Sequence, residues 1–242
     1  MKDGLGFLGA LVIGVGLGLG GWFVGDGFFK GRAAERYVTV KGVSERDVKA
    51  DIGLWPIRFV STHDDLSQAQ TRIAESKQII LDFLKSHGIH EDAVALQKLS
   101  VTDVLANPYR SGSTQSRYII SQTLMVRTNN PTPIQKASQH VADLVKAGVV
   151  LSSQGGTDSV PTYLFTQLSR LKPEMIAEAT ANARRAAAQF AEDSGSRIGK
   201  IRRARQGVFV ILPRDRAPGI MEGTQLEKTL RVVSTLQYYL KD

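Results

Sequence analysis

GLGFLGALVIGVGLGLGGWFVG, residues 4–25, is an apolar N-terminal segment that precedes a longer, more polar body. The segment holds no charged residue. As a helix rising about 1.5 Å per residue it would reach roughly 33 Å, which is enough to cross the ~30 Å core of a bilayer. We therefore predict a single transmembrane anchor over residues 1–30, followed by one body over residues 31–242.

The alternative for this stretch is a cleaved signal peptide. Such a peptide has a charged start, an apolar run of about 7–15 residues and a cleavage site of small residues. Here the apolar run is longer, and Lys2 is offset by Asp3. The following residues, 26–32, offer no good cleavage site, so the sequence favours an anchor that stays attached.

Six glycines in the segment are spaced in a way that suits close packing of helices. Small residues four apart give a helix a flat face that another backbone can approach. One interpretation is that the anchor self-associates; the other is that glycine is simply tolerated in membrane helices. The glycines concerned are Gly14, Gly16, Gly18, Gly20, Gly21 and Gly25.

The composition of the rest indicates a folded body. Without the anchor roughly 210 residues remain, which is enough for one substantial domain or two small ones. The hydrophobic fraction is 42%, and there is no cysteine, so disulfides and thiolate chemistry are excluded. The net charge of +8 suggests attraction to anionic surfaces. Because the basic residues are spread along the chain, we expect no nucleic acid partner.

Alternating and helical patterns in the body predict an α+β fold. The fold is expected to have two similar αβ halves with mixed or antiparallel sheets, in intertwined subdomains covering roughly residues 37–130 and 131–242. We expect a turn at 44–47, an irregularity at Trp55-Pro56, and surface loops at 107–116 and 213–223. The predicted strands cover residues 37–42, 48–61, 94–107, 117–128, 162–169, 198–212 and 229–240, where 198–212 is either a strand pair or one long bent strand. The predicted helices cover 66–87, 131–147 and a long stretch that begins at Pro173 and ends at Gly195.

Three stretches of the body resemble the SIMPL-domain family. AEATANARRAAAQFAEDSGSRIGKI, residues 177–201, is similar to the signature of that family. VTVKGVSERDVKADIGLW at 38–55 and RYIISQTLMVRT at 117–128 stand where the family has its opening strand pair and its central strand. The resemblance covers roughly residues 37–242. Many members have a cleaved signal, and this chain departs from them if its anchor is retained.

The resemblance implies an exported bacterial envelope protein of α+β fold. Some members form ring- or channel-like homo-oligomers, and some are linked to oxidative-stress defence or are immunogenic periplasmic proteins. The family supplies no catalytic residues that could be transferred to this chain. The expected location is therefore the bacterial inner membrane, single-pass, with the body in the periplasm. The positive-inside rule alone favours a cytoplasmic body, because Lys30, Arg32 and Arg36 follow the anchor.

Few residues suggest catalysis or metal binding. His87 and His90 flank Gly88 with only Glu91-Asp92 nearby, so we expect no metal site and no cofactor. Ser169 and Lys172 match a Ser-x-x-Lys pattern, but so short a pattern arises often by chance. We therefore expect no enzymatic activity.

The densest group of positive charge suggests an anionic partner, such as lipid headgroups, polysaccharide or nucleic acid. The alternative, which the sequence favours, is a solvated strand face or a set of salt bridges to a neighbouring subunit. The residues are Arg197, Lys200, Arg202, Arg203 and Arg205.

The function expected from these observations is a non-catalytic, membrane-anchored envelope protein. It would form a ring- or channel-like homo-oligomer through sheet edges and the alanine-rich helix, with a link to envelope or oxidative-stress defence. The second hypothesis is an envelope binding module that recruits a partner, which can be another envelope protein, or a ligand through loops 107–116 and 213–223. The lipid bilayer and further copies of the chain are the expected partners.

Overall fold

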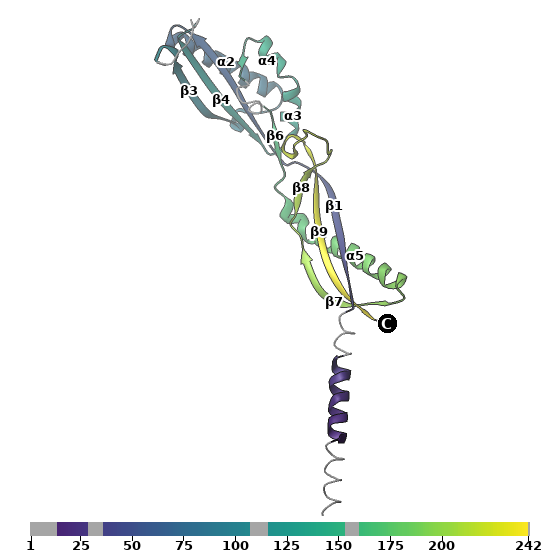
Figure 1. The fold of residues 1–242 in the computed structure, drawn as a ribbon. Helices are drawn as coiled ribbons and strands as arrows, with labels where there is room; N and C mark the ends of the chain where they lie inside the picture. The colour runs from purple at the N-terminus through teal and green to yellow at the C-terminus, as the bar shows by residue number, and fades with distance from the viewer. Residues whose placement is uncertain (1–13, 29–35, 107–115, 153–159, 242) are drawn as a thin grey trace, which may run out of the picture. The chain divides into compact units, whose positions relative to one another are not determined.

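The computed structural model describes residues 14–28, 36–106, 116–152 and 160–241 (Figure 1). Its body divides into two compact units that share the chain. Unit 1 contains Met1–Glu45, Pro173–Phe209 and Arg231–Asp242; unit 2 contains Arg46–Lys172 and Val210–Leu230. Each unit has an antiparallel sheet, so the predicted α+β class is confirmed. The division does not fall near residue 130, because the helices after that residue pack in unit 2.

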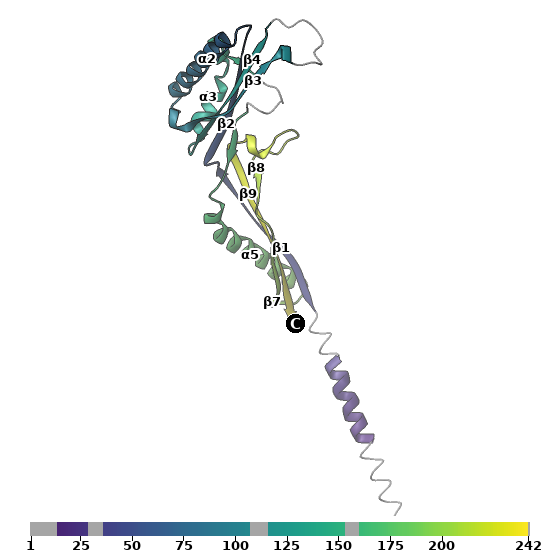
Figure 2. The same ribbon diagram turned by 90° about the vertical axis from the view of Figure 1, so that its left-hand side faces the viewer.

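Unit 1 is a sheet covered on one face by a long helix. Its strands lie in the order β1 (Tyr37–Lys49), β9 (Glu227–Lys241), β7 (Arg197–Gln206), and β8 (Val210–Pro213) also pairs with β9. Helix α5 (Leu168–Asp193) runs along one face, as Figure 2 shows. Its buried alanines repeat every four residues and so form one narrow stripe. They are Ala179, Ala183, Ala187 and Ala191.

This stripe packs inside unit 1 against β1 and β9. Ala183 and Ala187 contact Val40, Leu236 and Tyr238 in one buried cluster. The sheet of its own chain therefore covers this stripe, whereas Ala177, Ala181 and Ala188 of the same helix are exposed. Contact between subunits through the alanine-rich helix stays a prediction.

Unit 2 is a sheet with helices on one face, among them α2 and α3, which Figure 2 labels. The strand order is β3-β4-β2-β5, and β6 also pairs with β2. Trp55, Ile57 and Phe59 alternate along β2 and point into the core under α2 and α3. The strands are β2 (Ile52–His63), β3 (Val94–Asp103), β4 (Tyr118–Thr128), β5 (Val150–Leu151) and β6 (Thr162–Leu164). The helices are α2 (Leu66–Ser86), α3 (Thr132–Gln139) and α4 (Ala142–Lys146), with short 3-10 turns η1 (Glu91–Ala93), η2 (Val104–Ala106) and η3 (Glu222–Thr224).

The predicted turn at 44–47 is wrong, because β1 continues through it to Lys49. The polar side chains that suggested a turn are held by distant parts of the chain. The Ser44 hydroxyl donates to the Glu178 carboxylate at 2.8 Å, and the Thr229 hydroxyl donates to the Asp47 carboxylate at 2.6 Å. The extended chain is interrupted at Ala50-Asp51 instead, between the end of β1 and the start of β2.

The start of the long helix also differs from the prediction. Helix α5 begins at Leu168, and Pro173 lies inside it. The predicted strand 162–169 therefore ends at Leu164, after which Thr166 donates its amide and hydroxyl to Asp51 at 2.9 and 3.0 Å. A proline early in a helix removes one backbone hydrogen bond, which this long helix tolerates.

One other predicted element is divided in the structure. The helix expected over 131–147 is split at His140-Val141 into α3 and α4. The stretch 198–212, expected as a strand pair or one long bent strand, is a pair of strands, β7 and β8, and each of them pairs with β9.

Residues 14–28 form a helix that is exposed along its length. Leu17, Trp22 and Phe23 are 74%, 75% and 73% exposed. Within the ranges that the structure describes, no helix combines the length and the apolar character that a membrane crossing needs. The predicted transmembrane helix thus has no support from these residues, and residues 4–13 of that stretch lie outside the description.

Candidate functional site

The six glycines predicted to mediate self-association all lie on the helix formed by residues 14–28. At about 100° per residue, Gly14, Gly18, Gly21 and Gly25 fall within an arc of roughly 60°, whereas Gly16 and Gly20 lie on the other side. A Cβ added at any of the six would meet no atom within 4 Å. The helix therefore presents one continuous glycine stripe with open space before it.

The predicted basic residues lie on β7, at the edge of the unit 1 sheet. Arg197, Arg203 and Arg205 pair with Lys241, Gln237 and Thr235 of β9, so they share the face opposite α5. All three are exposed. Lys200 is also exposed, in the stretch between Ile198 and Ile201 where the register shifts.

Arg202 extends this basic face toward the start of β1. Its guanidinium lies 4.1 Å from the ring centroid of Tyr37, which is a cation–π contact at the surface. Within the described ranges none of the five basic residues makes a salt bridge, whereas Arg231 of β9 pairs with Glu45 at 3.3 Å. Sequence reasoning found the cluster but not the face that it occupies.

Both edges of the unit 2 sheet carry exposed apolar side chains. On β3, Leu96, Leu99 and Val101 are 52%, 55% and 52% exposed. They pair with Leu124, Gln122 and Ile120 of β4 and therefore point to the face on which the helices lie. Helix α2 packs over β2 and β4, which leaves this side of β3 uncovered. Sequence alternation alone gave no sign of this exposure.

The opposite edge of the same sheet is apolar as well. Strand β5 pairs with β2 through Phe59 and Val60 only. Val150 on β5 is 58% exposed, and Val145 on the adjacent α4 is 59% exposed. The two edges are thus different surfaces, each with unpaired backbone and apolar side chains.

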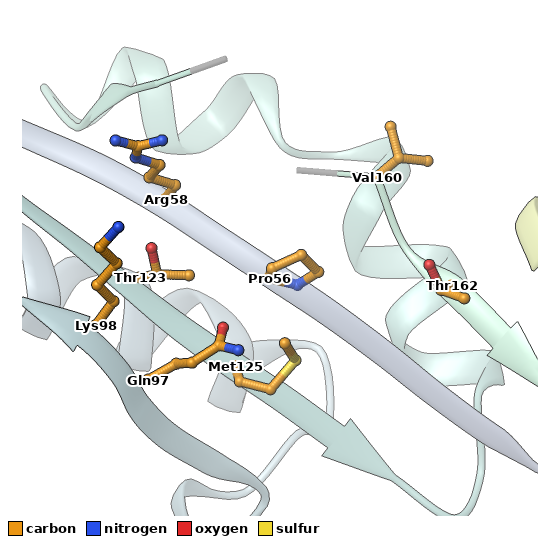
Figure 3. Close-up of a pocket in the computed structure, with 8 residues that line it drawn as sticks. All are labelled: Pro56, Arg58, Gln97, Lys98, Thr123, Met125, Val160 and Thr162. Carbon is orange, nitrogen blue, oxygen red and sulfur yellow. The ribbon is translucent and has the colours of Figure 1, made fainter. Parts of the chain in front are cut away.

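A pocket of about 570 Å³ lies on the other face of the unit 2 sheet, away from the helices (Figure 3). Sequence reasoning missed it, apart from the irregularity noted at Trp55-Pro56. Its described lining residues come from β2, β3, β4 and the segment that enters β6. They are Pro56, Arg58, Gln97, Lys98, Thr123, Met125, Val160 and Thr162.

The other residues considered for chemistry lie at the end of α2 and on the first turns of α5. His87 is the C-cap of α2, and its ring lies near that of His140, with the ring centroids 5.5 Å apart. Ser169 and Lys172 lie on the first turns of α5. No group of three or more possible metal ligands is found among the described residues.

The two predicted recognition loops differ in how far the structure describes them. Residues 107–115 of the first lie outside the description. In the second, the Gln225 side chain accepts from the Asp215 amide and donates to the Asp215 carbonyl, both at 3.1 Å. These two bonds hold the ends of the 215–225 segment together.

An ion pair joins the strands that lead into the first loop. Arg117 donates to both carboxylate oxygens of Asp103, with Nε–Oδ2 at 3.2 Å. This hydrogen bonding lowers the pKa of Asp103 below its ordinary value of 3.8. The pair closes the β3–β4 hairpin next to the Val104 amide, which donates to the Arg117 carbonyl at 2.8 Å.

Comparison with known proteins gives one family. The sequence matches SIMPL, described as "Protein of unknown function (DUF541)", over residues 38–234. No curated protein matches the chain. The match includes residues of both units, and it runs from the second residue of β1 into β9, where it ends at residue 234. The chain therefore belongs to the SIMPL family.

Proposed function

We propose that this protein is a non-catalytic structural protein of the bacterial envelope that assembles into a ring- or channel-like homo-oligomer. Its N-terminal apolar segment would hold the assembly at the inner membrane, with the body in the periplasm. A link to envelope or oxidative-stress defence is the expected physiological setting.

The observation that carries this proposal is the pair of unlike apolar edges on the unit 2 sheet. An exposed edge strand with apolar side chains tends to be covered by another chain. If the β5 edge of one copy docked beside β3 of the next, α4 with Val145 would come over the uncovered side of Leu96, Leu99 and Val101. A contact between two different surfaces repeats from copy to copy and closes into a ring when the rotation permits.

The glycine stripe on residues 14–28 supports the same proposal. Gly14, Gly18, Gly21 and Gly25 lie on one side of a helix whose other side chains, apart from Asp26, are apolar and exposed. Helices with such a stripe associate through close backbone packing in lipid. Neighbouring copies in a ring would bring these helices together.

The basic face supports placement at a membrane surface. Seven residues, 29–35, connect the N-terminal helix to the described start of the body, and they span at most about 25 Å. Tyr37 is the first residue of β1, and the guanidinium of Arg202 on β7 lies over its ring. Anionic lipid headgroups attract such clusters by about 1 kcal/mol per basic residue near the surface.

The test of the assembly is the mass of the full chain after extraction in a mild detergent, measured by light scattering. We expect a single species several times the mass of one 26.4 kDa chain. A monomer at every protein concentration would reject the proposal. A reporter active only outside the cytoplasm, fused after residue 242, tests the periplasmic placement separately.

The second candidate is an envelope binding module. It is favoured by the 215–225 segment, where the Gln225 side chain bridges to the Asp215 backbone and so orders a surface loop before any partner binds. In vivo crosslinking with Gln225→Ala tests it. An unchanged set of crosslinked partners would count against this candidate.

A further inference from the structure

Two irregularities of the unit 2 sheet face the same pocket. The first is Pro56, a proline within the central strand β2. The second is a β-bulge in β3, where the register with β4 shifts between Leu96 and Lys98. Both Pro56 and the residues of the bulge, Gln97 and Lys98, line the pocket (Figure 3).

Pro56 lies at a point where no described strand pairs with one side of β2. Strand β6 pairs with residues 52–54 of β2 and β5 pairs with residues 59–60, so Pro56 falls between them. On the other side it stands opposite Met125 of β4. Proline has no backbone N–H to donate to the hydrogen bonds of a sheet, and it is found in sheets where that donor is not needed. Val160 and Thr162 form one wall of the pocket.

The bulge at Gln97 changes the direction of two polar side chains. Leu96 pairs with Leu124 and Lys98 pairs with Thr123, so Gln97 has no partner residue on β4. In a regular strand Gln97 and Lys98 would point to opposite faces. Here both line the pocket. Bulges that redirect side chains occur often beside functional sites, and this one is placed at the rim of a cavity.

The pocket combines positive charge with an apolar floor. Arg58 and Lys98 lie at one end together with the Thr123 hydroxyl, as Figure 3 shows. Pro56, Met125 and Val160 supply apolar surface toward the other end. No carboxylate is among its described lining residues, and Lys98 makes no salt bridge in the described part of the chain. Its volume of about 570 Å³ is typical of a small-molecule site.

We propose that this pocket binds a small organic oxyanion, a carboxylate or phosphate attached to an apolar group. Lys98 and Arg58 contact the oxyanion, with the Thr123 hydroxyl and the Gln97 amide as further donors. The apolar part of the ligand lies on Pro56 and Met125. A macromolecule would need a far larger surface than this cavity offers. The proposal concerns unit 2 alone, so it does not depend on whether the protein assembles.

The test uses ligand-observed NMR with the full chain in detergent. The probes are benzoate and phenyl phosphate, with benzyl alcohol and benzylamine as uncharged and cationic analogues of similar shape. We expect one or both anions to bind with at least about tenfold higher affinity than benzyl alcohol, and benzylamine not to bind. The preference between benzoate and phenyl phosphate identifies the oxyanion. Equal binding of all four probes, or of none, would overturn the proposal.

Lys98→Gln assigns the binding to this pocket. Lys98 is exposed, so the substitution leaves the fold intact and removes one charge. We expect anion affinity to fall at least about fivefold. The matched control is Lys85→Gln, which removes the same charge from α2, on the other face of the sheet. Met125→Ala should weaken both anions and also benzyl alcohol. An equal loss of anion affinity in Lys98→Gln and Lys85→Gln would mean that the anions respond only to the net charge of the protein. That result would also reject the site.

Discussion

Gly42 of β1 lies directly against the backbone of Ala179 in α5. A Cβ added at Gly42 would overlap the Ala179 carbonyl oxygen and the Ala183 amide nitrogen, and it would lie 2.9 Å from the Ala183 Cβ. Because backbone atoms are involved, neither partner can rotate away. The absence of a side chain at position 42 therefore sets how closely α5 packs on the sheet.

Gly42→Ala should destabilise unit 1. Forcing a methyl group into this contact should cost about 3 kcal/mol, the upper part of the range for overpacking, and lower Tm by roughly 6–12 °C in a chain of this size. Circular dichroism melts measure the shift. Gly223→Ala is the matched control, since its Cβ would make an ordinary 3.4 Å contact with the Thr162 methyl. Equal melting of the two variants would contradict the packing described here.

Leu99→Glu should break the proposed assembly. A carboxylate placed at the centre of the β3 apolar surface would be buried without a partner, which costs about 3 kcal/mol or more and lowers the association constant at least about 100-fold. Mass measured by light scattering should fall to that of a monomer. Thr102→Glu adds the same charge to the other face of β3 and should leave the assembly intact. An unchanged mass for Leu99→Glu would exclude this edge as the contact.

Substitution of the glycine stripe should separate the N-terminal helices. The chain has no native cysteine, so Val24→Cys, at a position 74% exposed, gives a single crosslinking site. In that background we expect Gly18→Leu with Gly21→Leu to reduce disulfide dimer severalfold, because the leucines hold the backbones apart. Gly16→Leu with Gly20→Leu adds equal bulk on the other side of the helix. If both pairs reduce crosslinking alike, the stripe is not the contact.

The positive charge on the basic face of unit 1, opposite α5, should strengthen its contact with anionic lipid. In vesicles containing phosphatidylglycerol, we expect slower hydrogen exchange in β7 than in phosphatidylcholine vesicles. Arg203→Gln with Arg205→Gln should remove most of that difference. Arg184→Gln with Arg185→Gln removes the same charge from exposed positions on α5, across the sheet, and should preserve it. Equal hydrogen exchange of β7 in the two kinds of vesicle, measured on the unmodified protein, would refute the contact.

The Asp103–Arg117 pair should make the end of the β3–β4 hairpin sensitive to acid. The pKa of Asp103 is lowered in the folded protein, so its contribution is fully present above the ordinary value of 3.8 and is lost as pH falls below it. The protection of the Val104 amide, which is its intrinsic exchange rate at a given pH divided by the measured rate, should therefore fall in that range. In Asp103→Asn this protection should already be low at neutral pH and should show no such step. Protection that does not change with pH in the unmodified protein would contradict this.

Much of the local structure could be predicted from sequence patterns. The alternation of Trp55, Ile57 and Phe59 indicated a strand with one buried face. The pattern of apolar residues predicted α2, including its end near Gly88. The errors occurred where tertiary contacts override local preference. Ser44 and Asp47 look like turn residues, but Glu178 and Thr229, far away in the sequence, hold them in a strand.

The candidate sites were only partly visible in the sequence. The glycine spacing and the basic cluster can be counted from the residues, but the face on which each lies depends on helix phase and strand register. The uncovered side of β3 depends on where α2 packs, which no pattern in β3 records. The pocket depends on a bulge at Gln97 and on the pairing of β5 and β6 with separate parts of β2, and both arise only when the strands pair.

By itself, the sequence determined the α+β class, the approximate position of most strands and helices, and the resemblance to the SIMPL family, because hydrophobic period and helix-ending glycines act over a few residues. Only the tertiary structure decided which strands share a sheet, how the chain divides between two units, and which side chains remain exposed. Those outcomes depend on pairing between residues as distant as Asp47 and Thr229. Local propensity carries no information about such partners, since the packing of the whole chain selects them.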